Sequence, residues 1–222
     1  MKKKFAVIVF PGSNCDYDAY YVLKNKLNIN VDFVWHKESS LQSYDGILIP
    51  GGFSYGDYLR TGAIARFSPI MKEVIRYSKK GIPIIGICNG FQILLESGLL
   101  PGALINNNNI KFLSKQVTLN VETNSSIFTD KLNCNDRLKM PIAHKEGNYI
   151  AKKNTIIEMQ NNNQIIFKYI YNNPNGSIEN IAGITNEAGN VLGMMPHPER
   201  ACDKHLGSTD GILIFESMIG NC

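Results

Sequence analysis

The chain of 222 residues lacks three features that mark common protein classes: paired cysteines, a long apolar run and a strong charge excess. Its five cysteines are odd in number and irregularly spaced, which argues against a disulfide framework and for free thiols. Free thiols are typical of a reducing compartment, so we expect a cytoplasmic protein. No apolar run approaches the ~20 residues of a membrane helix. The net charge of +4 is scattered rather than gathered in a stripe, so we expect neither membrane nor nucleic acid as a partner.

Two ligand-binding signatures are also missing. The sequence contains no G-x-x-x-x-G-K-[ST] phosphate loop, so we expect no nucleotide chemistry of that kind on this chain. Cys202 and His205 have a C-x-x-H spacing, but no second pair completes a metal site. We therefore expect neither a metal nor a cofactor on this chain.

The hydrophobic pattern predicts an α/β protein, and the length suits a single domain over residues 1–222. Short apolar runs, typical of parallel strands buried on both faces, alternate with helical patterns. The expected strands are 5–10, 31–35, 47–49 and 82–87, and the expected helices include 16–27 and one around 70–75. This alternation indicates a mostly parallel central sheet with helices on both faces, a flavodoxin-like arrangement.

After residue 116 the pattern changes to short β-rich runs separated by polar loops. These runs, at 117–121, 165–171, 181–185 and 191–195, predict a small antiparallel β extension that returns to the main sheet near Val191. Residues 208–219 predict a closing amphipathic helix. The asparagine tracts 106–109 and 161–163 are expected to be exposed loops.

The strongest chemical signal is Cys88, which lies between an apolar run and a helical pattern. Gly86 and Gly90 flank it in a G-x-C-x-G arrangement, the thiol counterpart of a nucleophile elbow. Glycines allow strand and helix to approach closely, and a helix N-terminus favours the thiolate form. The alternative is that Cys88 is a small core residue, which is the usual fate of a lone cysteine beside a buried strand.

A second candidate element is Pro50-Gly51-Gly52, at the end of the preceding expected strand. Ligands of parallel sheets bind at the carboxyl ends of strands, so Gly52 and Cys88 can share one site. The backbone N–H groups of Gly52 and Asn89 are candidates for an oxyanion hole. The alternative for the two glycines is a simple tight turn.

Another expected strand is followed by His197, a candidate base, and Glu199, a candidate acid to orient it. Residues two apart in an extended segment project to the same side, and the flanking prolines favour that conformation. Glu199 can then hold one imidazole nitrogen of His197 while the other faces a nucleophile. Taken alone, His197 is more simply a hydrogen-bonded turn residue and Glu199 a surface carboxylate paired with Arg200. Together with Cys88 they predict a catalytic triad.

These motifs resemble those of class I, or triad, glutamine amidotransferases, at residues 86–92 (Gly-Ile-Cys-Asn-Gly-Phe-Gln) and 197–199 (His-Pro-Glu). Within that class, four more stretches resemble the family of glutaminase subunits of phosphoribosylformylglycinamidine synthase: residues 10–16, 50–60, 141–147 and 207–211. The similarity extends over essentially the whole chain.

The resemblance implies that Cys88 forms a γ-glutamyl thioester, with His197 as general base and acid and Glu199 as its partner. It implies further that Gln92 and residues 143–147, with His144 and Glu146 among them, hold L-glutamine or shape the site. The implied partners are a large synthetase subunit, which binds ATP and magnesium, and a small accessory subunit. That complex converts formylglycinamide ribonucleotide (FGAR) to formylglycinamidine ribonucleotide (FGAM) in de novo purine biosynthesis.

Three hypotheses remain open from the sequence. The first, which we favour, is the purine-pathway glutaminase. The second is another amidotransferase or hydrolase with the same triad. The third is a non-enzymatic thiol sensor built on the elbow cysteine, which would not need His197 or Glu199.

Overall fold

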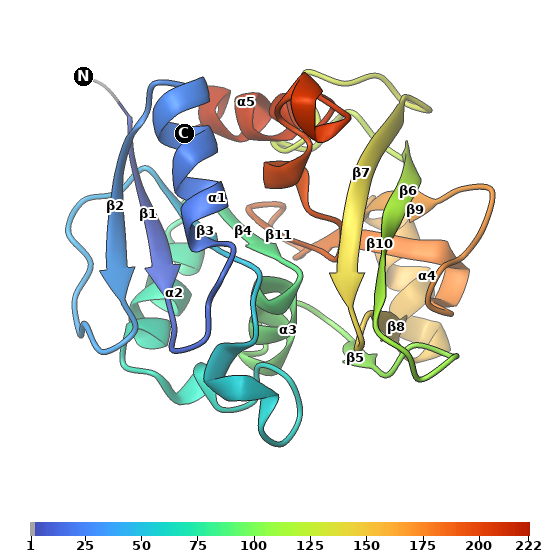
Figure 1. The fold of residues 1–222 in the computed structure, drawn as a ribbon, viewed down its shortest axis with the longest axis horizontal. Coiled ribbons are helices and arrows are strands. Elements are labelled where there is room, and N and C mark those ends of the chain that lie inside the picture. Colours follow the sequence, from blue (N-terminus) through green and yellow to red (C-terminus); the bar gives the residue numbers. More distant parts are fainter. Residues whose placement is uncertain (1–2) are drawn as a thin grey trace.

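A computed structural model describes residues 3–222, which form a nine-stranded sheet, a two-stranded sheet and the helices around them (Figure 1). In spatial order, the strands of the large sheet are β2 (Asn30–Trp35), β1 (Lys4–Val9), β3 (Gly46–Ile49), β4 (Ile84–Ile87), β11 (Val191–Met194), β10 (Ile181–Thr185), β9 (Ile165–Tyr169), β6 (Leu113–Val121) and β7 (Arg137–His144). The small sheet pairs β5 (Ala103–Ile105) with β8 (Asn148–Ile150).

The α-helices are α1 (Asp16–Tyr21), α2 (Ile70–Lys79), α3 (Asn89–Glu96), α4 (Lys153–Asn161) and α5 (Ile212–Gly220). A π-helical segment, η1 (Val22–Lys26), continues α1, so the expected helix over 16–27 is present with a looser second half. The remaining short helical turns are η2 (Ser54–Asp57), η3 (Ala65–Phe67), η4 (Ile178–Asn180), η5 (Pro198–Arg200) and η6 (Lys204–Leu206). In the described part of the chain, no helix combines the length and apolar character needed to cross a bilayer.

The first half of the chain builds the parallel part of the sheet, as the sequence predicts. Strands β2, β1, β3, β4 and β11 pair in parallel, and β3 and β4 are buried at every residue. Helix α1 lies in front of these strands and α2 lies behind them (Figure 1). This double covering explains the continuous apolar runs in the sequence, since a strand with helices on both faces has no solvent face.

The second half adds antiparallel strands to the same sheet. Strand β10 pairs antiparallel with β11, and β9, β6 and β7 follow in turn. The return to the main sheet near Val191 is confirmed, because β11 pairs in parallel with β4. Strand β7 and helix α4 are absent from the sequence prediction. The expectation that residues 106–109 form a wholly exposed loop is wrong at Asn107, which is buried and hydrogen-bonded beneath the end of β7.

Candidate active site

Three neighbouring strands bring the predicted site segments to one edge of the sheet. Ile49 of β3 pairs with Gly86 of β4, and Ile87 of β4 pairs with Met194 of β11. The segments that leave these strands therefore start side by side. A hydrogen bond of 2.8 Å from the Cys88 N–H to the Met194 carbonyl joins two of them. The Gly-Gly turn, the cysteine and the histidine segment share this edge although they lie far apart in the sequence.

Cys88 sits in a strained elbow between β4 and α3. Its backbone angles are φ 51° and ψ −104°, a region that costs on the order of 1–3 kcal/mol for a residue with a side chain. A Cβ at Gly90 would lie 2.0 Å from the Ile49 carbonyl oxygen, and one at Gly86 would lie 2.7 Å from the Gly90 carbonyl carbon. Only glycine fits at either position, so the predicted close approach of strand and helix is confirmed. The elbow places the sulfur at the start of α3.

His197 and Glu199 form a buried pair. The imidazole Nδ1–H donates to Glu199 Oε1 at 2.5 Å, and the residues are 1% and 2% exposed. Burial alone would lower the pKa of His197, but the Glu199 carboxylate and the Cys88 sulfur raise it well above its usual value. The carboxylate fixes the ring so that Nε2 is the nitrogen left for chemistry.

The Cys88 thiol lies close enough to His197 for the sulfur to influence the imidazole charge. At rest, its S–H points to the Ala143 carbonyl, 3.6 Å away, and His197 Nε2 has no hydrogen-bond partner within residues 3–222. The sequence-predicted triad members are thus brought together in the structure.

A second sulfur, which the sequence analysis did not single out, lies beside the same imidazole. Cys15 Sγ, a His197 ring nitrogen and a Glu199 oxygen all lie within 4.8 Å of one another, a grouping that could hold a metal ion. However, the Arg200 guanidinium donates to Cys15 Sγ at 3.2 Å, and its positive charge opposes a bound cation. Arg200 pairs with Asp18, at 3.0 Å, rather than with Glu199. Burial raises the pKa of the Cys15 thiol.

The two predicted oxyanion donors occupy suitable places. Asn89 is the first residue of α3, so its N–H has no acceptor within the helix. Gly52 has φ +148° and lines the pocket next to Cys88. The backbone bonds of this turn are made by its neighbours, from Phe53 N–H to Gly12 O and from Cys15 N–H to Gly51 O. The Gly52 N–H takes part in neither of these backbone hydrogen bonds.

Side-chain amides tie the pocket walls together. Asn89 accepts from the Ser54 N–H at 3.1 Å and donates to Gln92 Oε1 at 2.9 Å. Gln92 Nε2 in turn donates to the Glu146 carbonyl at 2.7 Å. Gln92 therefore lines the pocket with both ends of its amide held by the protein, and its position is fixed.

His144 lies in the same pocket in a defined tautomer. Asn107 Nδ2 donates to the carbonyls of Lys111 and His144, which identifies Asn107 Oδ1 as the oxygen. That oxygen accepts from the Gly147 N–H and from His144 Nδ1, both at 3.1 Å. Nε2 of His144 is then a bare acceptor, and it has no partner in the described part of the chain. Burial, followed by the nearby charge of His197, lowers the pKa of His144 to about 4.

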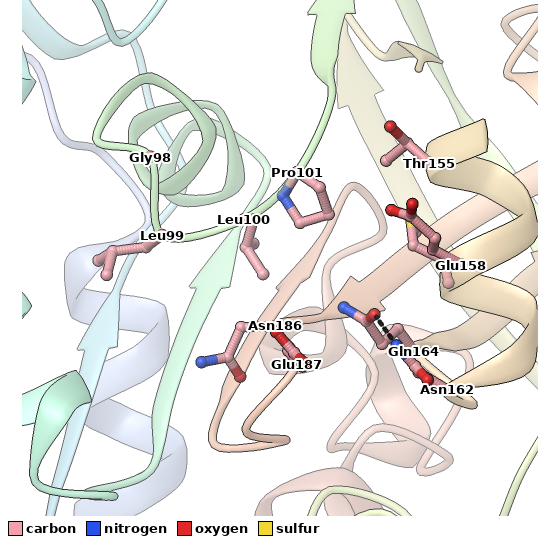
Figure 2. A pocket seen from close by; sticks show the side chains of 11 residues that line it. Gly98, Leu99, Leu100, Pro101, Thr155, Glu158, Asn162, Gln164, Asn186 and Glu187 are labelled. Atoms are coloured by element: carbon pink, nitrogen blue, oxygen red, sulfur yellow. Dashed lines mark hydrogen bonds between the residues drawn. The ribbon is translucent and has the colours of Figure 1, made fainter. Parts of the chain in front are cut away.

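The cavity at Cys88 measures about 140 Å³ and includes Glu146, which the resemblance implied, and Asp57, which the sequence analysis did not assign to substrate binding. A cavity of this size is smaller than the ~300 Å³ at which drug-sized ligand sites begin, so it suits a small polar molecule. A larger groove of about 550 Å³ lies elsewhere, between the segment after α3, helix α4 and the β10–β11 turn (Figure 2). Its side chains include Thr155, Glu158 and Glu187 but none of the predicted site residues.

Comparison with known proteins shows the family and the fold of the chain. A family model described as CobB/CobQ-like glutamine amidotransferase domain matches residues 2–210. The chain is 43% identical to a chain in the structure of PurLQS from Thermotoga maritima, with a TM-score of 0.91, covering 100% of this chain and 99% of that one. A glutamine amidotransferase from Thermotoga maritima is 14% identical, with a TM-score of 0.64, covering 100% and 98% of the two chains, and shows the same fold.

Proposed function

The chain belongs to the family of CobB/CobQ-like glutamine amidotransferase domains, and from this premise we propose that it is the glutaminase subunit of a phosphoribosylformylglycinamidine synthase. It would hydrolyse L-glutamine to glutamate and ammonia and pass the ammonia to a synthetase subunit that converts FGAR to FGAM. The observation that carries the proposal is the buried His197–Glu199 pair beside a strained elbow cysteine. Whole-length similarity to a PurLQS chain supports the purine assignment.

In the proposed reaction, the Cys88 thiolate attacks the γ-carboxamide carbon of glutamine. The negative oxygen of the tetrahedral intermediate is held by the N–H groups of Gly52 and Asn89. His197 gives a proton to the leaving ammonia, which produces a γ-glutamyl thioester. His197 then takes a proton from water, whose attack releases glutamate and restores the thiol. Glu199 keeps the imidazole in the same orientation and tautomer throughout.

The proposed partners are a large synthetase subunit, which would carry ATP and magnesium, and a small accessory subunit. Ammonia is largely protonated at neutral pH and is then not nucleophilic, so it must reach its acceptor before it mixes with bulk water. The chain itself contains no P-loop motif, which agrees with ATP chemistry on another subunit. All five cysteines are free, which agrees with a reducing compartment such as the cytoplasm.

The test is glutamine hydrolysis by the wild type, Cys88→Ala and Cys134→Ala, each with and without the synthetase. Loss of the nucleophile should lower kcat by at least ~10⁴-fold. Cys134 is exposed and outside the pocket, so Cys134→Ala is the matched control and should keep full activity. Equal turnover by wild type and Cys88→Ala would reject the glutaminase proposal.

Two further outcomes separate the alternatives. Glutaminase activity that never supports FGAM formation with the synthetase would favour another triad amidotransferase. A thiol sensor would keep its function after His197→Ala, whereas the glutaminase would lose it. We also expect low activity from the isolated subunit, because an uncoupled glutaminase wastes glutamine.

A further inference from the structure

The active-site cavity holds more hydrogen-bond acceptors than the proposed chemistry uses. Besides Cys88, its walls carry Asp57, Glu146 and His144. Asp57 Oδ1 is buried and, within the described residues, has no hydrogen-bond partner. His144 is 3% exposed, and its bare Nε2 is a second unpartnered acceptor. Buried acceptors without donors are costly, so their presence indicates a ligand that supplies N–H groups.

The side-chain hydroxyl and amide donors on the same walls, from Thr61 and Gln92, are already engaged. Thr61 donates its hydroxyl to Glu146 Oε2 at 2.7 Å, and Gln92 donates its amide to the Glu146 carbonyl. Lys145 also lines the cavity, but this residue is exposed to solvent. The inner wall therefore presents two carboxylates and a neutral imidazole acceptor, an environment that suits a small cation with several donors.

The two carboxylates also repel each other. Burial, and then the charge of Glu146, raise the pKa of Asp57 to about 6. A cation placed between them removes this repulsion and supplies the missing hydrogen bonds to Asp57. A primary ammonium group, with three N–H donors and one positive charge, fits both requirements.

We propose that Asp57 and Glu146 bind the α-ammonium group of the amino-acid substrate while its side-chain amide lies at Cys88. This inference rests on the proposed glutaminase function and names the contact that selects a free amino acid over a simple amide. Thr61 is a positioning residue, because it fixes the Glu146 carboxylate through their hydrogen bond.

The test compares L-glutamine with 4-carbamoylbutanoate, which is glutamine without its α-amino group. Both compounds are titrated by calorimetry into the complex carrying Cys88→Ala, so that binding is measured without turnover. The same titrations are made with Asp57→Asn and Glu146→Gln added, and steady-state KM and kcat are measured for each variant with Cys88 intact. Glu158→Gln, in the groove of Figure 2, is the matched control for loss of a carboxylate outside the cavity.

We expect each pocket substitution to weaken L-glutamine binding about tenfold or more, the size typical of a charged hydrogen bond, and to leave 4-carbamoylbutanoate binding unchanged. The KM for glutamine should rise more than kcat falls, and Glu158→Gln should match the parent. Equal losses for both compounds, or no loss for L-glutamine, would overturn the inference while the glutaminase proposal stands. A wild-type complex that does not hydrolyse glutamine would instead overturn the proposed function.

Both variants keep the shape of the side chain, and thermal unfolding will show whether they fold. Asp57 has no donor to lose at Oδ1, so Asp57→Asn should unfold at or above the parent temperature. If Glu146→Gln is unstable through its bond to Thr61, Asp57→Asn alone decides the outcome.

Discussion

Two regions of the molecule each bring a buried histidine close to Cys88, and they give it opposite properties. The segment after β11 carries His197, whose ring donates to a carboxylate and whose pKa is raised. The end of β7 carries His144, whose ring donates to the Asn107 amide oxygen and whose pKa is lowered to about 4. Both residues are at least 97% buried, from exposed fractions of 1% and 3%. The charge of the hydrogen-bond partner, rather than burial, decides which histidine carries a proton.

This difference suits two roles. A histidine that is protonated at neutral pH can give a proton to a leaving amine, whereas a neutral one can only accept a hydrogen bond through Nε2. Removing the charge beside His197, or adding a charge beside His144, should therefore give each histidine part of the other's role.

The largest effect is expected from Glu199→Gln, which removes the charge behind His197 and keeps the shape. The pKa of His197 should fall below its usual value, because burial is then unopposed by Glu199. The amide can also select the wrong tautomer, so we expect kcat for glutamine to fall by about 10²–10⁴-fold. Glutaminase kinetics and an NMR titration of the imidazole check these two outcomes.

Asp18→Asn is the control in the same region. It breaks the half-exposed ion pair with Arg200, an interaction worth ~0–1 kcal/mol, and leaves the His197–Glu199 pair intact. Its kcat should stay within about twofold of the parent. A large loss in this variant, or a small loss in Glu199→Gln, would contradict the assignment of the imidazole charge to Glu199.

The next effect is expected from Asn107→Asp, which gives His144 the kind of partner that His197 has. The pKa of His144 should rise from about 4, and its imidazolium should repel an incoming ammonium group. We expect the KM for glutamine to rise by roughly tenfold, with a smaller change in kcat. Asp also loses the donors to Lys111 and His144 carbonyls, so stability should fall by about 1–3 kcal/mol. NMR titration and thermal unfolding separate these two effects, and a His144 pKa that stays low would refute the comparison.

The smallest effect concerns pH. Asp57 is ionised above its pKa of about 6 and neutral below it, so affinity for the ammonium group is present at high pH and lost on acidification. The other titratable groups lining the cavity are Cys88, His144, Lys145 and Glu146, and His144 stays neutral above pH of about 4. We expect KM to rise roughly fourfold from pH 7 to pH 5.5. In Asp57→Asn the profile should be flat over this range, and an unchanged profile would contradict the role of Asp57.

Much of the parallel half could be read from the sequence because its signals are local. A continuous apolar run predicts β4, and the glycines at 86 and 90 predict the elbow that the structure contains. His197 and Glu199 are two residues apart, so their hydrogen bond follows from local geometry. Each of these inferences needed only a few neighbouring residues.

The other half depends on contacts that no local pattern reveals. Strand β7 alternates buried Leu138, Met140, Ile142 and His144 with more exposed residues, but Pro141 reads as a break within it. The proline is tolerated because β7 is the edge strand of the sheet. Helix α4 buries only Ile156 and Met159, so its apolar pattern is weak.

One pocket residue and one residue that supports the pocket escaped the sequence analysis for a related reason. Asp57 follows a turn in which several residues adopt positive φ, and Asn107 lies in a polar tract that resembles a surface loop. Nothing in their immediate neighbours indicates that one side chain enters a cavity and that the other supports a histidine. Only the packing of distant segments defines these roles.

The edge position of β7 has a consequence for access to the cavity. Within residues 3–222 its only ladder is to β6. Outside that ladder, the His197 N–H donates to the Pro141 carbonyl, the Lys139 N–H donates to the Asp210 carboxylate, and the Cys88 thiol donates to the Ala143 carbonyl. The cavity is therefore bounded on its β7 side by a strand with a single ladder and a few hydrogen bonds, whereas Cys88 follows a strand that is paired on both sides.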